Sequence, residues 1–267
     1  MSAPAIAAKY NGAMSDVGVE LDGATHVATI EIQRGPNNYF DIDVLAQLAD
    51  EMHGVAERGA RAIVLASDGK HFCAGADFSG AAGRVGRDGG PHLYDVAIRL
   101  FEQPLPIVAA VQGAAVGGGL GLALAADFRV ATPESRFAAN FSQLGFHPGF
   151  GLSVTLPRVV GHQAALDLLY TGRRIDGSTA HALGLCDHLA TVEELRGRAG
   201  ELAAEIAAAA PLAVRSIRQT LRGSLVDDVR AAMAHERSEQ ERLQRTDDFR
   251  EGIAATAERR DPRFTGR

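Results

Sequence analysis

The first part of the chain divides into apolar runs typical of strands and apolar positions at helical spacing. Alternating apolar residues over 17–21 and the apolar run 27–32, joined by a turn, predict a β-hairpin. Apolar residues at helical spacing after Asp41, a residue that favours the N-cap position, predict a helix. The run 61–67 (RAIVLAS) is apolar on both faces and predicts a buried strand.

The stretch 105–127, LPIVAAVQGAAVGGGLGLALAAD, is the most informative part of the pattern. Its first seven residues predict a buried strand, Gln112-Gly113 ends that strand, and the glycine triplet opens an Ala/Leu-rich helix over 120–126. A strand, a glycine turn and a helix N-terminus direct free backbone N–H groups at one point, which suits an oxygen that develops negative charge. The alternative is a purely structural strand–helix corner, in which the glycines only permit close packing.

After this stretch the expected elements shorten and then become helical. Short strands are expected at 128–131 and 136–140, followed by a loop over 141–150. The expected helices are 92–102, 152–160, 163–170, 178–183, 193–209, 212–222, 225–244 and 247–258. The Gly- and Arg-rich segment 79–91 is expected to be a mobile loop. The sequence therefore predicts an α/β protein with a loose tail at 1–14, a core over 15–190 and a helical region over 191–267.

Composition and charge narrow the function classes. The 267 residues are 46% hydrophobic and 22% charged, which is typical of a globular protein. The formal net charge of −6 and the lack of a basic run argue against a nucleic-acid partner. Two cysteines fit a reducing compartment, and no signal peptide or membrane segment is evident. We expect a cytoplasmic protein with no membrane partner and no metal site.

Five segments, taken in order, resemble the enoyl-CoA hydratase/isomerase (crotonase) family over nearly the full chain. They are HFCAGADF at 71–78, VQGAAVGGGLGLALAAD at 111–127, LGFHPGFG at 144–151, LYTGRRIDGSTAHALGLCD at 169–187 and ERRDPRF at 258–264. The resemblance implies a spiral of repeated ββα units, with C-terminal helices that help to form a homotrimer or a dimer of trimers. It also implies an acyl-CoA substrate, with coenzyme A as part of that substrate and no separate cofactor.

The resemblance assigns an oxyanion hole to the backbone N–H groups of Ala76 and Gly118, which hold the thioester oxygen while an enolate forms. Ala74, Asp77 and Gly117 flank these two donors and are expected to contact the substrate. Three further residues match positions that contact coenzyme A. These are Arg34 and Asn37 in the loop 34–38, and Arg259, whose place in the family reaches a phosphate of the cofactor portion.

The sequence departs from the family where hydratases carry their acid–base groups. The positions of two water-activating glutamates are Gly121 and Phe141, and the position of a catalytic Asp in some relatives is Gly149. His147 is the candidate proton-transfer residue, because an imidazole titrates near neutral pH. Phe141 is expected to make the acyl site apolar, and all three substituted positions are expected to border the substrate.

The reaction therefore remains open at the level of sequence. Hydration or isomerisation with His147, or with water held by the Gly149 backbone, is the first hypothesis. An acyl-CoA decarboxylase or thioester hydrolase is the second, because enolate or oxyanion stabilisation alone can lower those barriers. A non-catalytic acyl-CoA-binding member of the family is the third.

Overall fold

The computed structural model describes residues 15–76 and 92–267. The predicted tail 1–14, the predicted loop 79–91 and the candidate residue Asp77 lie outside the described residues. Within the described part of the chain, no helix combines the length and the apolar composition needed to cross a membrane.

Two sheets form the centre of the fold. The larger sheet has the strand order β1-β2-β3-β4-β6-β9, in which β1 and β2 form an antiparallel hairpin and the other neighbours are parallel. The smaller sheet has the order β5-β7-β8. The strands are β1 Val17–Asp22, β2 Val27–Ile32, β3 Ala62–Ser67, β4 Ile107–Val111, β5 Ala114–Val116, β6 Phe128–Ala131, β7 Arg136–Ala138, β8 Arg174–Asp176 and β9 His188–Leu189.

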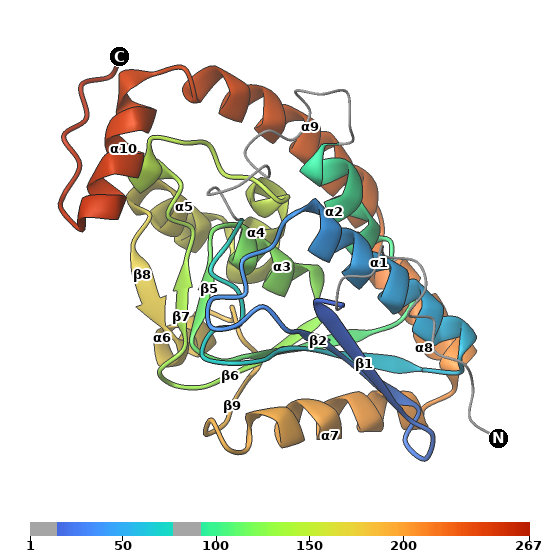
Figure 1. Ribbon diagram of the computed structural model, residues 1–267. Coiled ribbons are helices and arrows are strands. Elements are labelled where there is room, and N and C mark those ends of the chain that lie inside the picture. The colour runs from blue at the N-terminus through green and yellow to red at the C-terminus, as the bar shows by residue number, and fades with distance from the viewer. Residues whose placement is uncertain (1–14, 77–91) are drawn as a thin grey trace.

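Helices cover both faces of the larger sheet (Figure 1). The helices are α1 Ile42–Glu57, α2 Leu93–Phe101, α3 Gly118–Ala125, α4 Leu152–Val160, α5 His162–Thr171, α6 Gly177–Ala182, α7 Leu195–Ala208, α8 Pro211–Arg222, α9 Leu225–Leu243 and α10 Asp247–Glu258. α7 lies along one face and α1, α2 and α3 lie on the other. Because both faces are covered, all six residues of β3 are buried, as its uninterrupted apolar run predicts.

Small side chains on the buried face of α7 allow this helix to approach the sheet closely. Leu195, Ala199, Ala203 and Ala207 recur every four residues and pack as one buried cluster with side chains of β2, β3, β4 and β6. The larger buried cluster, on the opposite face, contains the phenylalanines that border the candidate site.

The helices and the longer strands follow the sequence prediction, whereas three short strands do not. β5, β8 and β9 have two or three residues each and lie within glycine turns or beside polar residues, so no apolar run marks them. α3 begins at Gly118, two residues before the predicted start, because the chain already turns at Gly117, where φ is +56°. The predicted loop 141–150 includes a 3₁₀ turn over Ser142–Leu144, against which α10 packs.

Candidate active site

The start of α3 presents the first pair of free backbone donors. The Gly117 N–H donates to the Ala138 carbonyl at 2.9 Å, which joins the end of β5 to β7. The next two N–H groups, those of Gly118 and Gly119, have no acceptor within residues 15–76 and 92–267. This is the arrangement that a helix N-terminus leaves for an external oxygen.

The segment 73–76 lies beside this helix end. Cys73 pairs with β5 through two backbone hydrogen bonds, of 2.9 and 3.1 Å, and the Phe40 N–H donates to the Gly75 carbonyl at 3.1 Å. In such a parallel bridge the N–H of Ala76 points away from Phe40 and towards the side on which β5 lies. That N–H also has no acceptor among the described residues.

Gly75 allows the two segments to approach. Its φ is +111°, and a methyl group added to it would lie 3.2 Å from the Val116 carbonyl oxygen and 4.0 Å from the Gly118 nitrogen. A side chain at Gly119 would overlap the Cys73 carbonyl, so α3 also contacts this segment directly. The geometry therefore brings Ala74, Ala76, Gly117 and Gly118 together, as the sequence analysis expected.

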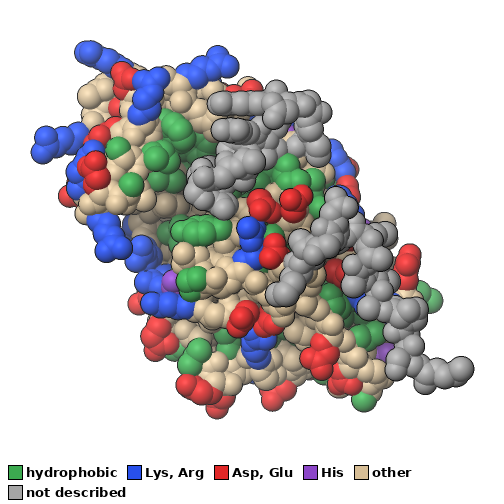
Figure 2. Space-filling model, in the orientation of Figure 1, with side chains coloured by type: hydrophobic (Ala, Val, Ile, Leu, Met, Phe, Trp, Pro, Cys, Tyr) green, Lys and Arg blue, Asp and Glu red, His purple; other side chains and the backbone are tan. Residues whose placement is uncertain are grey.

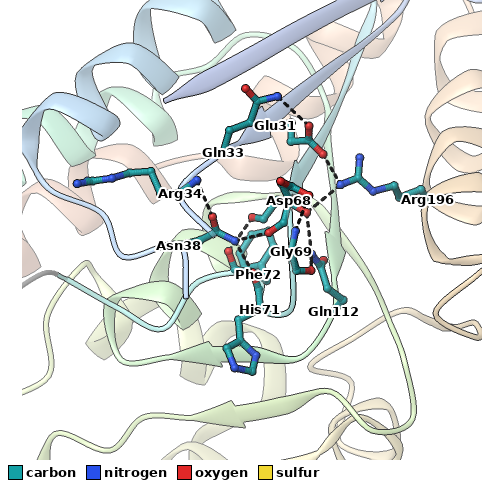
Figure 3. A network of polar contacts seen from close by, with 11 residues as sticks. Glu31, Gln33, Arg34, Asn38, Asp68, Gly69, His71, Phe72, Gln112 and Arg196 are labelled. Carbon is teal, nitrogen blue, oxygen red and sulfur yellow. Dashed lines mark hydrogen bonds and ion pairs between the residues drawn. The ribbon is translucent and has the colours of Figure 1, made fainter. Parts of the chain in front are cut away.

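The loop 34–38 is fastened to residues 68–71 by one side chain (Figure 3). Asn38 is fully buried, accepts the Arg34 N–H at 2.9 Å, and donates to the carbonyl oxygens of Asp68 and His71, both at 2.6 Å. Its φ of +50° is one that Asn tolerates better than most residues. The neighbouring Asn37 contributes a backbone carbonyl, which accepts the Ala74 N–H at 3.0 Å.

Sequence analysis singled out Asn37 and missed Asn38. Both asparagines stand in the same predicted turn, so residue type alone does not tell them apart. The Asn38 side chain makes three buried hydrogen bonds, whereas the Asn37 side chain makes none in the described part of the chain. The signal that distinguishes them is the left-handed backbone of the second, which appears only once the loop is folded.

The Arg34 side chain is held by acidic neighbours. Its Nη1 donates to Asp41 at 2.8 Å, and its Nε lies 3.6 Å from a carboxylate oxygen of Asp16. Asp41 is also the N-cap of α1, where it accepts the Val44 N–H at 3.0 Å, as predicted from the sequence. The guanidinium therefore stabilises the loop, and its proposed contact with coenzyme A stays a prediction.

A second set of polar contacts joins the ends of β2 and β3 to α7 and to Gln112, the residue that follows β4 (Figure 3). Arg196 of α7 pairs with Glu31 and donates to the Ser67 carbonyl at 2.8 Å. Gln112 donates to the same carbonyl at 2.7 Å, and to that of Gly69 at 3.3 Å. These bonds anchor the strand ends from which the segment 68–76 departs.

Aromatic rings occupy the region where hydratases carry glutamates. A methyl group added at Gly121 would lie 2.6 Å from Cβ of Phe150 and 2.9 Å from two of its ring atoms. Phe141 is 7% exposed and stacks with Phe146, with their ring centroids 6.5 Å apart. Figure 2 shows hydrophobic side chains along a hollow beside the lobe that carries α10. Apolar side chains therefore surround both positions, and the prediction that Phe141 makes the acyl site apolar stays a prediction.

The Tyr94 hydroxyl fills the space beside Gly149. A side chain at Gly149 would overlap this hydroxyl and would lie 2.5 Å from Nε2 of Gln240. Tyr94 donates to Oε1 of Gln240 at 2.8 Å, and Nε2 of Gln240 donates to the His147 carbonyl at 2.9 Å. Burial raises the pKa of the Tyr94 phenol well above its usual range, so the hydroxyl stays protonated.

Two further predicted residues, His147 and Arg259, lie beside α9 and at the end of α10, and within the described residues neither is hydrogen-bonded to the backbone donors. The imidazole of His147 contacts the Pro148 carbonyl at 2.8 Å and lies edge-on to the ring of His235 of α9, at a centroid distance of 5.6 Å. Arg259 is an exposed residue at the end of α10, with φ at +56°. Its neighbour Arg260 forms the ion pairs with Glu251 and Glu258 that hold this end of the helix.

The two-sheet fold is that of solved enoyl-CoA hydratase/isomerase structures, and membership of that family makes this chain an α/β enzyme that acts on acyl-CoA thioesters. The sequence profile of the "Enoyl-CoA hydratase/isomerase" family matches residues 22–267. The chain belongs to the enoyl-CoA hydratase/isomerase family.

Several relatives cover most of the chain. A "Putative enoyl-CoA hydratase" from Thermus thermophilus is 38% identical over 232 residues, which are 82% of this chain and 88% of the relative. The "1,2-epoxyphenylacetyl-CoA isomerase" of Escherichia coli is 30% identical over 250 residues, which are 90% of this chain and 95% of the relative. A crystal structure of an enoyl-CoA hydratase/isomerase from Pseudoalteromonas atlantica T6c superposes with a TM-score of 0.83 at 30% identity, covering 94% of this chain and 100% of that one. The predicted family and fold are confirmed.

Proposed function

We propose that this enzyme stabilises the enolate of an acyl-CoA thioester with the backbone N–H groups of Ala76 and Gly118. The observation that carries the proposal is that neither N–H has an acceptor in the described part of the chain, although Gly75 brings their two segments into contact. Fixed donors of this kind act where charge develops and typically contribute about 3–4 kcal/mol each to the transition state.

Isomerisation of an enoyl thioester, which passes through such an enolate, is the reaction favoured first. Hydration by a pair of glutamates is disfavoured, because positions 121 and 141 carry no carboxylate and aromatic rings take up the adjacent space. Names of both kinds occur among the relatives, since the one from Escherichia coli is named an isomerase of an acyl-CoA and the one from Thermus thermophilus a putative hydratase. The proton-transfer role of His147, or of water held by the Gly149 backbone, stays a prediction.

Decarboxylation of a malonyl-type thioester is the second candidate, and the same apolar surroundings favour it. Loss of CO₂ leaves its electron pair on the α-carbon and thus forms the enolate without a base, after which one proton adds to carbon. This reaction needs donors for the thioester oxygen and an apolar site for the departing carboxylate. A thioester hydrolase or a non-catalytic binder would instead give free acid or no product.

The test removes the Ala76 N–H in one variant and compares it with a control variant that changes only the Ala76 side chain. Ala76→Pro deletes the N–H, whereas the matched control Ala76→Gly keeps it and deletes only the methyl group. We expect Ala76→Pro to lower kcat/KM about 10²–10³-fold, and Ala76→Gly to stay close to the wild type. The assays follow enoyl-thioester absorbance, double-bond position and release of CO₂ on a panel of enoyl- and malonyl-type thioesters.

Binding separates this role from general damage to the site. An S-alkyl coenzyme A thioether lacks the carbonyl oxygen, so its affinity should be the same in wild type, Ala76→Pro and Ala76→Gly. Turnover by Ala76→Pro at the wild-type rate would refute the oxyanion hole. Thioester binding without turnover on the whole panel would favour the non-catalytic alternative.

The contacts with the coenzyme A portion are part of the same proposal. Arg259 is exposed and makes no ion pair with another described residue, so its guanidinium is free to meet a phosphate. We expect Arg259→Gln to weaken binding of coenzyme A but not of 3′-dephospho-coenzyme A. Equal weakening of binding to the two ligands would contradict a contact between Arg259 and the 3′-phosphate, the group by which they differ.

The homotrimer, or dimer of trimers, also stays a prediction. It draws support from α8, on which Leu212, Ile217 and Leu221 are 79%, 58% and 74% exposed. Of these, Ile217 and Leu221 are one turn apart and lie on the same face of the helix, and large apolar side chains exposed together are typical of interaction surfaces. Light scattering during size-exclusion chromatography measures the assembly directly.

A further inference from the structure

Phe150 combines three properties that are rarely found together. Its φ is +61°, it is 1% exposed, and it is followed by Gly151 at +72°. A bulky residue in the left-handed region is an outlier that persists only where the surrounding structure holds it, and such outliers cluster at functional sites.

Helix α9 holds the chain on both sides of Phe150. On one side, Glu236 is fully buried and accepts the Gly151 N–H at 2.8 Å. On the other side, Gln240 donates to the His147 carbonyl at 2.9 Å and accepts the Tyr94 hydroxyl at 2.8 Å. These bonds fix the backbone of the segment 147–151, and they explain why Phe150 can keep an unfavourable conformation.

The ring that this conformation directs inward reaches the first turn of α3. It occupies the space beside Gly121, where an added methyl group would lie 2.6 Å from Cβ of Phe150. It also packs on Phe40, with centroids 5.3 Å apart, and Phe40 in turn lies 2.6 Å from the position of a methyl group on Gly118. The ring of Phe150 therefore connects the segment that α9 holds to the helix end that carries a proposed oxyanion donor.

We propose that Phe150 is a specificity-determining residue, whose ring closes the acyl site beside Gly121 and so limits the size of the acyl group. Tyr94 and Gln240 are its positioning residues, since they act through the backbone of the segment 147–151. The inference rests on the proposed function, because that function makes Gly118 one end of the acyl site.

Phe150→Leu tests the limit on size. Wild type and variant are compared on straight-chain and aryl acyl-CoA thioesters of increasing size, by kcat/KM and by calorimetric affinity. We expect the ratio of large to small substrate to rise about 10-fold or more, as a pocket enlarged by a few carbon atoms allows. The affinity for coenzyme A without an acyl group should stay unchanged.

Phe101→Leu is the matched control. This ring also contacts Phe150, at 6.3 Å between centroids, but it belongs to α2 and lies within the same buried core. An unchanged ratio in Phe150→Leu, or an equal shift in Phe101→Leu, would overturn the proposal, because general loosening of the core would then account for any effect.

Tyr94→Phe keeps the aromatic ring and removes only the hydroxyl, so the proposal remains testable if Phe150→Leu fails to fold. We expect the ratio of large to small substrate to shift in the same direction by a smaller factor. A lower melting temperature with an unchanged ratio would show a merely structural role for Tyr94. Ala76→Pro is expected to lower turnover of every thioester alike, whereas Phe150→Leu changes the ratio between thioesters, so failure of the proposed function and failure of this inference are distinguishable.

Discussion

Replacing Asn38 by alanine removes the side chain that joins the loop 34–38 to the segment leading to Ala76. Three hydrogen bonds are lost, and Asn38 is fully buried, so water does not readily replace them. The matched control is Asn37→Ala, because the Asn37 side chain makes no hydrogen bond in the described part of the chain and its backbone bond to Ala74 is retained.

The expected magnitude follows from these contacts. Three hydrogen bonds at about 1 kcal/mol each give about 3 kcal/mol, and alanine at a φ of +50° adds about 1 kcal/mol, for a total of about 4 kcal/mol. For a chain of this size, a change of 1 kcal/mol shifts the melting temperature by about 2–4 °C, so Asn38→Ala should lower it by about 8–16 °C. Asn37→Ala should change the free energy of unfolding by less than about 0.5 kcal/mol.

Urea unfolding followed by circular dichroism measures both variants. We expect the midpoint to fall for Asn38→Ala with an unchanged m-value, because the surface exposed on unfolding is the same. Turnover should fall as well, since the clamp positions the segment that carries Ala76. Similar midpoints for the two variants would refute the reasoning, because the neighbouring asparagines would then be equivalent.

Three further predictions concern stability and reactivity. Asp127 pairs with Arg218 and Arg222 of α8 at 2.9 and 3.1 Å, so Asp127→Asn leaves two buried cations without a counter-charge. We expect the free energy of unfolding, measured in urea, to fall by about 3–5 kcal/mol, and a loss below about 1 kcal/mol would contradict this. Burial raises the pKa of Cys73 and of Cys186 to about 12, so both thiols should react with a disulfide reagent only after unfolding, and rapid labelling of the native protein would show the interpretation to be wrong. Burial lowers the pKa of His71 below 6.5, and the nearby cations Arg136 and Lys70 lower it further. The contribution of His71 to stability is therefore complete above its unfolded-state pKa and is lost as the pH falls through its folded-state pKa. The melting temperature of the wild type should therefore fall more between about pH 7 and about pH 5 than that of His71→Gln, and parallel pH curves would oppose this assignment.

Local patterns predicted much of the fold because the forces behind them act over short stretches of chain. Burial on both faces makes β3 a continuous apolar run, and the Asp41 side chain caps α1 within its first turn. The strand and helix within 105–127 followed from apolar runs and glycines, although the glycine turn itself concealed β5. β5, β8 and β9 gain their structure from partners elsewhere in the chain, so their own sequence did not identify them.

For the site, the sequence by itself determined which chemical groups are available. It placed Ala76 and Gly118 in glycine-containing turns, and it established that Gly121, Phe141 and Gly149 supply no carboxylate. It did not determine what occupies the space beside those glycines.

Only the tertiary structure decided that question. Phe150 fills the space beside Gly121, and the Tyr94 hydroxyl fills that beside Gly149, in each case from a segment distant along the chain. The same packing distinguishes Asn38 from Asn37, because the carbonyl groups that Asn38 binds belong to another loop. Propensity and periodicity arise from neighbours within a few residues, whereas close packing is set by whichever side chains the completed fold brings to one place.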